Sequence, residues 1–308
     1  MKKYSNLIIV ILSFTTLIFI LLNKTLISKT IITSFDIWFN TLVPSMFPMF
    51  ILSDILINYN FTDYIPNKII NFISKLFNIS KNAVLVIFLS IISGLPTNAI
   101  NIRNALDKNL ISKNEAEHLL LFNHFANPLF VLETIGVFYL NNNKYGIIIL
   151  LSHILGNIII GILSRKKNYY SNDNYISKNY KSQNFGNVLS SSIKKSIDCL
   201  LMVSGSVTLF LVLSTLIINV FNLNGYLSMI IQGILEMTMG TSSLSMLDIS
   251  DIIKVVVSTM IISFGGLSIH LQVISVLDDK IRYRNYFVGR IYQMFISGIL
   301  SYIFMIII

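Results

Sequence analysis

Charged side chains are scarce in this 308-residue sequence: Asp, Glu, Lys and Arg make up 12% of it, whereas 54% of the residues are hydrophobic. A soluble domain carries about 25% charged residues, so this chain has too few to cover a surface that faces water. The net charge of +9 comes from basic residues that lie between apolar segments. Positive-inside membrane topology accounts for them, so nucleic acid is not an expected partner. We therefore expect an integral membrane protein.

Further absences exclude several functions. A single cysteine, Cys199, rules out an internal disulfide framework. The four histidines lack the spacing of a zinc protease, and the chain has neither a Gly-x-Ser-x-Gly elbow nor a Walker phosphate loop. We expect no cofactor and no metal, and we do not expect an enzyme.

What the sequence does contain is long apolar runs that are interrupted, and one kind of interruption occurs twice. Residues 84–102 are broken at Ser93-Gly94-Leu95-Pro96, and residues 256–274 at Gly265-Gly266-Leu267-Ser268. Unpaired backbone groups are not tolerated in hydrocarbon, so a broken helix survives where it lines a protein-enclosed or watery cavity. Paired breaks in two halves indicate a transporter's binding site. The pattern predicts a site near the bilayer midplane.

The apolar runs predict an all-helical polytopic protein with two related halves, whose broken or re-entrant helices meet near the midplane. Domain boundaries are expected at 1–163, 164–195 and 196–308, and the basic linker 164–195 should face the cytoplasm. Aligning Gly94 with Gly266 gives a faint internal repeat. In the first half we expect an uncleaved helix at 4–22, a span at 34–58 bent near Pro44 and Pro48, an amphipathic surface helix at 66–79, a broken span at 82–102, a polar connector at 103–118, a span at 119–140 broken at Asn127-Pro128, and an ordinary span at 145–163.

The second half is expected to contain segments 196–220, 226–244, 252–276 and 285–307. A full crossing by 226–244 would place the basic residues that follow position 279 outside, against the positive-inside bias. A re-entrant hairpin or an interfacial helix at 226–244 removes the conflict. Glu236 lies in this segment, and a carboxylate in an apolar stretch is usually functional. It is predicted to hold a coupling proton or sodium ion, or to pair with Arg290 or His270, unless it is merely solvated.

Four ordered runs carry a family likeness: SGLPTNAINIRNAL, LISKNEAEHLLLFNHFANPLFVLETIG, ILEMTMG and SFGGLSIHLQVISVL. The chain resembles the YlbJ family of sporulation integral membrane proteins, also called SpoVV, from about Trp38 to Arg290. That family is grouped with nucleoside-recognition Gate domains, which are similar to concentrative nucleoside transporters. The resemblance implies a protein that moves dipicolinic acid across the outer forespore membrane. In that family a lysine often follows the Pro-Thr-Asn-Ala run, where this chain has Ile100, so the resemblance implies another cation, such as Arg103 or Arg290.

Dipicolinate is a planar dianion, so its site needs donors and positive potential, which helix N-termini at the breaks supply. Nearby amides, hydroxyls and imidazoles add donors, although the amides could instead join helix to helix. Arg103 could bind a carboxylate or face the cytoplasm beside Asp107. The candidate substrate-binding residues are Gly94, Pro96, Thr97, Asn98, Asn101, Arg103, Asn123, His124, Asn127, Gly265, Gly266, Ser268, His270 and Gln272, with Glu236 as the coupling residue.

We therefore predict a sporulation membrane transporter for a small dicarboxylate, located in the cell membrane and the outer forespore membrane. The alternatives are a nucleoside or other small-solute carrier, and a non-transporting sporulation scaffold. Expected partners are dipicolinate and membrane lipid, with other sporulation membrane proteins or a second copy of the chain left open. A scaffold has no reason to break helices inside the membrane, which favours transport.

Overall fold

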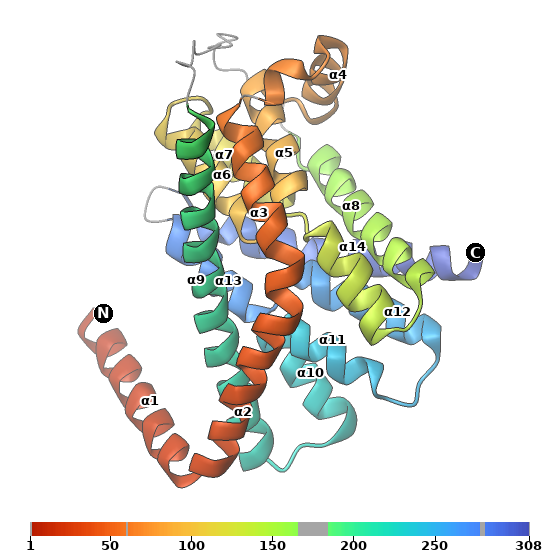
Figure 1. The fold of residues 1–308 in the computed structure, drawn as a ribbon. Helices are drawn as coiled ribbons and strands as arrows, with labels where there is room; N and C mark the ends of the chain where they lie inside the picture. Colours follow the sequence, from red (N-terminus) through yellow and green to blue (C-terminus); the bar gives the residue numbers. More distant parts are fainter. Residues whose placement is uncertain (1, 60, 166–183, 278–280, 308) are drawn as a thin grey trace.

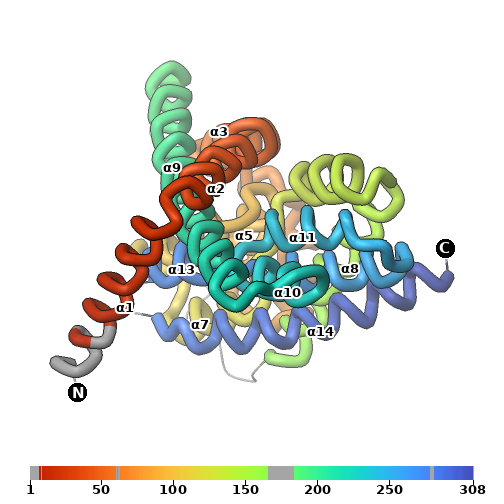
Figure 2. Tube along the Cα trace, turned by 90° about the horizontal axis from the view of Figure 1, so that it is seen from below, coloured from red at the N-terminus to blue at the C-terminus, as the bar shows by residue number. Residues whose placement is uncertain are grey.

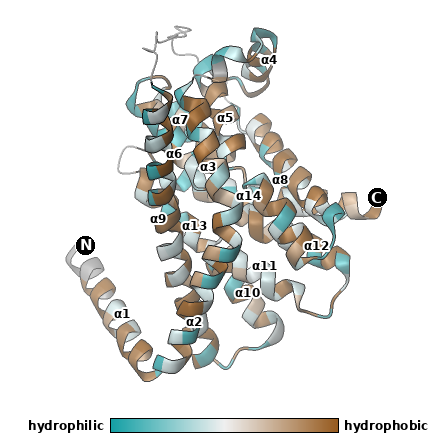
Figure 3. Cartoon of the chain, in the orientation of Figure 1, coloured by the Kyte–Doolittle hydropathy of each residue, from teal (hydrophilic) through white to brown (hydrophobic). Residues whose placement is uncertain are grey.

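The computed structural model describes residues 2–59, 61–165, 184–277 and 281–307, and all its regular elements there are helices (Figure 1). Five helical segments are long and apolar enough to span a membrane, or six if the bent pair α4 (Asn67–Phe77) and α5 (Lys81–Ser93) counts as one. Apolar residues cover the helices of the body, and hydrophilic ones gather around α4 (Figure 3). This architecture confirms the predicted all-helical polytopic membrane protein.

Two long helices run side by side along one flank of the molecule. One is the continuous stretch Lys24–Asn58, made of α2 (Lys24–Ile37), η1 (Trp38–Leu42) and α3 (Val43–Asn58), and the other is α9 (Phe185–Val220). Ser34 and Thr208 share a hydrogen bond of 2.8 Å, and the Trp38 indole donates to the Leu200 carbonyl at 2.9 Å. Polar contacts of this kind join helices in lipid, where there is no hydrophobic driving force between them. We call these two helices the long-helix pair.

The predicted span 34–58 is confirmed as helix, but it begins ten residues earlier, at Lys24. Its irregularity falls just before Pro44, as a π-helical turn in which the Val43 N–H donates to the Trp38 carbonyl. A proline removes a backbone donor inside a helix, and a widened turn is one way to accommodate the loss. The helix α1 (Lys2–Leu22) covers the predicted first segment and extends away from the body (Figure 2). It makes a sharp angle with α2 (Figure 1).

Two helical hairpins lie in the body. In the first hairpin, α5 turns back into α6 (Thr97–Asp107). Asn82, near the start of α5, donates to the Leu110 carbonyl just beyond the end of α6. In the second hairpin, α10 (Gly225–Leu235) turns at Glu236 into α11 (Met237–Ser245), and Gly240 lies against the backbone of Gly233. The re-entrant arrangement preferred for 226–244 agrees with this geometry.

Each hairpin is followed by a broken span and then by a continuous helix. Helix α7 (Lys113–Phe122) stops at residues 123–127, the first break, before the π-helical segment η3 (Phe130–Tyr139) and α8 (Asn143–Leu163). Helix α12 (Asp251–Phe264) stops at Gly265, the second break, before α13 (Gly266–Leu277) and α14 (Tyr283–Ile307). The two halves thus share the order long helix, hairpin, broken span, final helix. By this order Gly94 corresponds to Glu236, not to Gly266 as the sequence alignment had it.

Other sequence predictions meet the structure with mixed results. The amphipathic helix predicted at 66–79 is α4, which buries Ile70 and Phe77. The ordinary span predicted at 145–163 is α8, with Gly161 against the rings of Phe77 and Phe122. The polar connector predicted at 103–118 is wrong for most of its length, because α6 and α7 cover all but residues 108–112. Of the linker predicted at 164–195, residues 166–183 lie outside the described ranges, and α9 begins at Phe185.

Candidate functional site

The first break is held in place by side chains from other helices. Asn98 of α6 donates to the Phe125 carbonyl at 2.9 Å, and Asn157 of α8 donates to the His124 carbonyl at 3.1 Å. The His153 imidazole, also on α8, accepts from the Ala126 N–H at 3.0 Å. Backbone groups that leave a helix inside an apolar body need such partners. The break therefore exists because two neighbouring helices, α6 and α8, supply its hydrogen bonds.

The tip of the first hairpin lies directly against the first break. Gly94 has a φ of +75°, and a Cβ there would come within 2.9 Å of the Asn127 Cα. Glycine is required at this position both for the left-handed conformation and for the close approach. The Asn127 side-chain oxygen accepts from the Leu129 N–H at 2.9 Å, which starts η3. Gly94 and Asn127, both predicted site residues, are thus brought together.

The second break is arranged in a similar way, with the second hairpin against it. Gly265 and Gly266 have φ values of +89° and +67°. A Cβ on Gly266 would lie 3.0 Å from the Met237 nitrogen and 3.2 Å from the Glu236 Cα. The Glu236 carboxylate is buried and accepts from the Met239 N–H at 2.8 Å, so it caps α11. Glu236 therefore lies beside the second break rather than in solvent.

Arg290 of α14 connects the two breaks. Its guanidinium donates to the His124 carbonyl of the first break at 3.4 Å and to the Ser263 carbonyl before the second break at 3.5 Å. It also donates to Asn157 at 3.3 Å and to Gln293. The side chain is fully buried, and within the described ranges no Asp or Glu forms an ion pair with it. A cation deep in an apolar body is expensive and is usually functional.

Three rings form a chain between the breaks. The His124 ring lies 4.5 Å from the Tyr286 ring, centre to centre, and the Tyr286 ring lies 4.9 Å from that of His270. His270 uses both ring nitrogens, one with the Tyr283 hydroxyl at 2.6 Å and one with the Phe264 carbonyl at 3.1 Å. The two predicted histidines are therefore neighbours of one tyrosine. His270 already has protein partners for its polar atoms, whereas His124 has none in the described structure for either ring nitrogen.

Many predicted site residues carry a buried polar atom that no described group pairs with. Buried polar groups in proteins are nearly always hydrogen-bonded, so a concentration of unpaired ones indicates where water or a ligand binds. Arg290 Nε and the Tyr286 hydroxyl belong to the same group of atoms. The predicted residues concerned are Asn98 (Oδ1), Asn123 (Oδ1), His124 (Nδ1 and Nε2), Asn127 (Nδ2), Ser268 (Oγ) and Gln272 (Oε1).

Other predicted residues take part in structural contacts. Arg103 pairs with Asp107 at 2.7 Å and donates to the Leu277 carbonyl at the end of α13, which favours its placement beside Asp107. Thr97 donates to the Gly94 carbonyl, and Asn101 donates to Ser93 across the hairpin turn. The Gln272 amide donates to Ser206 of α9 at 2.5 Å. Pro96 follows a cis peptide bond in the buried hairpin tip.

Three buried residues were not among the sequence candidates: His153 and Asn157, which bond the first break, and Gln293, which bonds His153. The Gln293 amide donates to the His153 carbonyl at 3.1 Å, so α8 and α14 are joined at the level of the breaks. The spacing of these polar residues in the sequence could have identified them. His153 and Asn157 are four residues apart in the 145–163 span, and Arg290 and Gln293 three apart in the 285–307 span. That spacing puts polar groups on one face of each helix.

The fold and this buried polar centre define an integral membrane protein with two hairpins and two broken spans. The chain is similar to the sporulation integral membrane protein YlbJ of Bacillus subtilis (strain 168), with 25% identity over 299 residues. The alignment covers 85% of this chain and 73% of that protein. This similarity supports the resemblance to the YlbJ family and a sporulation membrane protein. No protein-family model matches the chain, and no solved structure matches it.

Proposed function

We propose that the protein is a sporulation membrane transporter that moves dipicolinic acid from the mother cell across the outer forespore membrane. The observation that carries the proposal is Arg290, a fully buried cation beside both breaks with no acidic partner in the described structure. A charge at the bilayer centre costs at least about 2.5–3.5 kcal/mol, so its retention calls for a reason. An anionic substrate that passes between the breaks supplies one.

The surroundings of Arg290 suit a planar dicarboxylate. Its present partners are mainly carbonyl oxygens, which are neutral and can be exchanged for a carboxylate. A carboxylate bonded to a guanidinium is among the stronger pairs in proteins. The unpaired ring nitrogens of His124 and the unpaired Nδ2 of Asn127 offer further donors near the first break. We assign Arg290 as the cation that takes the role implied for the lysine absent at Ile100.

Glu236 fits the coupling role in this scheme. Its carboxylate is buried at the tip of the second hairpin, beside Gly266, and no described Lys or Arg pairs with it. A buried carboxylate of this kind must be protonated or must hold a cation. A proton or a sodium ion bound there would offset the charge of the substrate.

Two alternatives are tested by the same experiments. The likeness to nucleoside-recognition Gate domains suggests a carrier of nucleosides or other small neutral solutes. A sporulation scaffold would transport nothing. A neutral substrate gives no reason to bury Arg290 without an acid, and a scaffold gives no reason for the unpaired polar atoms at the breaks.

The proposal is tested by flux into liposomes that contain the purified protein. Dipicolinate uptake should be inhibited by unlabelled dipicolinate and not by pyridine-2,6-dicarboxamide, which has the same shape without the charges. Arg290→Gln should lower uptake at least about tenfold, because hydrogen bonds to charged groups are worth about 1.5–3 kcal/mol. Arg290→Lys should retain part of the activity. Arg284→Gln, an exposed position on the same helix, is the matched control and should transport like the wild type.

Three results would contradict the proposal. Uptake of a nucleoside but not of dipicolinate would favour the first alternative. No flux of either solute, with protein that a thermal denaturation curve shows to be folded, would favour the scaffold. Dipicolinate uptake that is unchanged in Arg290→Gln would remove the assignment of Arg290.

A further inference from the structure

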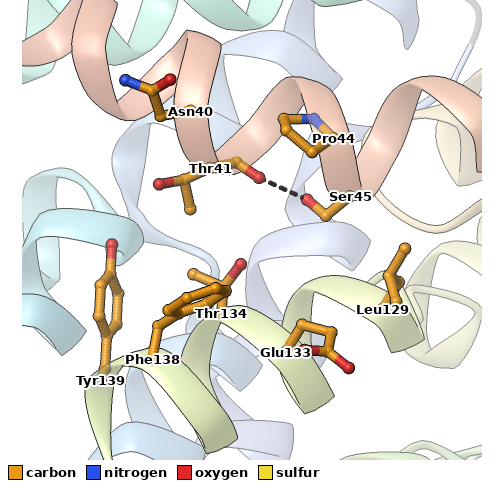
Figure 4. Close-up of a pocket in the computed structure, with 9 residues that line it drawn as sticks. All are labelled: Asn40, Thr41, Pro44, Ser45, Leu129, Glu133, Thr134, Phe138 and Tyr139. Carbon is orange, nitrogen blue, oxygen red and sulfur yellow. Dashed lines mark hydrogen bonds between the residues drawn. The ribbon is translucent and has the colours of Figure 1, made fainter.

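A separate cavity lies between the long helix Lys24–Asn58 and η3, and none of its lining residues is among those predicted from the sequence. Its volume is about 480 Å³, within the range of small-molecule sites. Both walls carry irregular turns: one includes the π-helical turn Trp38–Leu42 just before Pro44, and the other is the π-helical segment Phe130–Tyr139. Such widened turns are frequent at functional sites. Figure 4 shows the two helices facing each other across the cavity.

The lining has a definite chemical character. The described lining combines apolar groups, of which Phe138 is the largest, with hydroxyl groups from both walls. Glu133 provides the one carboxylate among these residues. None of the described lining residues is Lys, Arg or His, so the cavity is opposite in character to the surroundings of Arg290. A second acid, Asp36, lies one helical turn before the lining residue Asn40 and accepts a hydrogen bond from its amide at 2.6 Å. The lining residues are Asn40, Thr41, Pro44, Ser45, Leu129, Glu133, Thr134, Phe138 and Tyr139.

We propose that this cavity is a second ligand site, which takes a small organic cation with an aromatic or apolar body. Glu133 lies in the apolar segment Phe130–Tyr139 with its side chain exposed, and a carboxylate that faces lipid is expensive unless a cation accompanies it. The rings of Phe138 and Tyr139 suit a ligand ammonium group, because a cation is attracted to an aromatic face. The hydroxyls of Thr41 and Thr134 can accept from its N–H groups. The cavity is far larger than a bare metal ion requires, which favours an organic ligand.

The site is tested with three probes of nearly one shape and different charge: benzylammonium, benzyl alcohol and benzoate. Binding to the full-length protein in lipid nanodiscs is measured by saturation-transfer NMR and calorimetry. Benzylammonium should bind most tightly and benzoate least. Glu133→Gln should weaken benzylammonium at least about tenfold, as expected for the loss of a charged hydrogen-bond partner. Asp248→Asn, an exposed carboxylate outside the lining, is the matched control and should leave binding unchanged.

A second variant tests the location by volume instead of charge. Thr41→Phe places a ring in the cavity and should abolish benzylammonium binding while leaving thermal stability near that of the wild type. Equal binding of the three probes, or unchanged binding in both Glu133→Gln and Thr41→Phe, would overturn the proposal. Dipicolinate flux is read separately through Arg290, so failure of one proposal leaves the other standing.

Discussion

The two broken spans solve one problem by different means. The first break is five residues long, contains no glycine, and depends on Asn98, His153 and Asn157 from other segments for its hydrogen bonds. The second break is a glycine pair with positive φ angles, and it is paired mostly within its own span. There the Gly265 N–H donates to the Ile261 carbonyl at 2.9 Å, and His270 bonds the Phe264 carbonyl. One break is built by tertiary contacts and the other by local conformation.

This difference implies different sensitivities to mutation. A locally built break should tolerate distant changes and should fail when its own glycines are replaced. A break built by tertiary contacts should fail when donors from elsewhere are removed. Arg290 is the exception to this division, because it donates to the carbonyls at both breaks.

The largest effect should come from Gly289→Leu. Gly289 of α14 lies against the Leu121 carbonyl at the end of α7, so a side chain there would separate α14 from the first break. We expect the protein not to fold, since an overpacked backbone contact of this kind belongs to the few mechanisms that cost more than about 4 kcal/mol. Size-exclusion chromatography and thermal denaturation in detergent show whether the variant folds. Gly205→Leu on α9, where a Cβ would meet nothing within 4 Å, is the control. Equal stability of the two variants would contradict the packing described.

His153→Ala should have the next largest effect, and it acts on the first break. The change leaves the Ala126 N–H, Ser263 and Gln293 short of a buried partner, at about 1–3 kcal/mol for each unsatisfied group. We expect a total loss of about 3 kcal/mol or more in thermal or denaturant unfolding. Replacing Ser191, a partly exposed hydroxyl on α9, with alanine is a control that removes one local hydrogen bond. A loss for His153→Ala no greater than that of the control would show that the first break does not depend on α8.

The glycines of the second break should differ from each other. Gly265→Ala meets nothing closer than 3.6 Å, so its cost should be the left-handed strain alone, about 1–2 kcal/mol. Gly266→Ala carries the same strain and also approaches the Met237 nitrogen at 3.0 Å, so it should cost more. Unfolding of the two variants, measured side by side, checks the order. A larger loss of stability for Gly265→Ala than for Gly266→Ala would mean that the second hairpin does not pack closely against this break.

The smallest effect on stability is expected for Glu236→Gln. The amide oxygen can still accept from the Met239 N–H, so the cap of α11 is kept and the loss should stay below about 1 kcal/mol. Transport should nevertheless be lost or uncoupled if the carboxylate binds the coupling cation. Dipicolinate flux at matched protein levels provides the measurement. Wild-type flux in this variant would reduce Glu236 to a structural cap.

The comparison of the breaks also explains what could be predicted from the sequence. The second break was visible because Gly265-Gly266 interrupts an apolar run, and Asn127-Pro128 marked the first because proline restricts the residue before it. A re-entrant hairpin or an interfacial helix at 226–244 was predicted from charge bias and from a carboxylate in an apolar segment, and the structure has a hairpin there. These are local signals, and each agreed with the structure.

What could not be predicted depends on contacts between distant segments. The donors His153 and Asn157 sit in a helix that reads as an ordinary span, and nothing local shows that they face the first break. The repeat was aligned on similar glycine sequences, yet Gly94 turns a hairpin while Gly266 continues a span. The cavity beside Glu133 arises where η3 meets the long helix Lys24–Asn58, so no single segment contains its pattern.

The place of Arg290 along the chain has a consequence for biosynthesis. The carbonyl of His124, to which it donates, is made 166 residues earlier. At about 5–20 residues per second, the ribosome needs roughly ten to thirty seconds to cover that distance. Until α14 emerges, the newly inserted first half must keep an open polar segment away from lipid without its final donor. Insertion factors or the translocon have to shelter that segment, so truncation before residue 290 should leave a membrane-inserted chain that proteases can recognise.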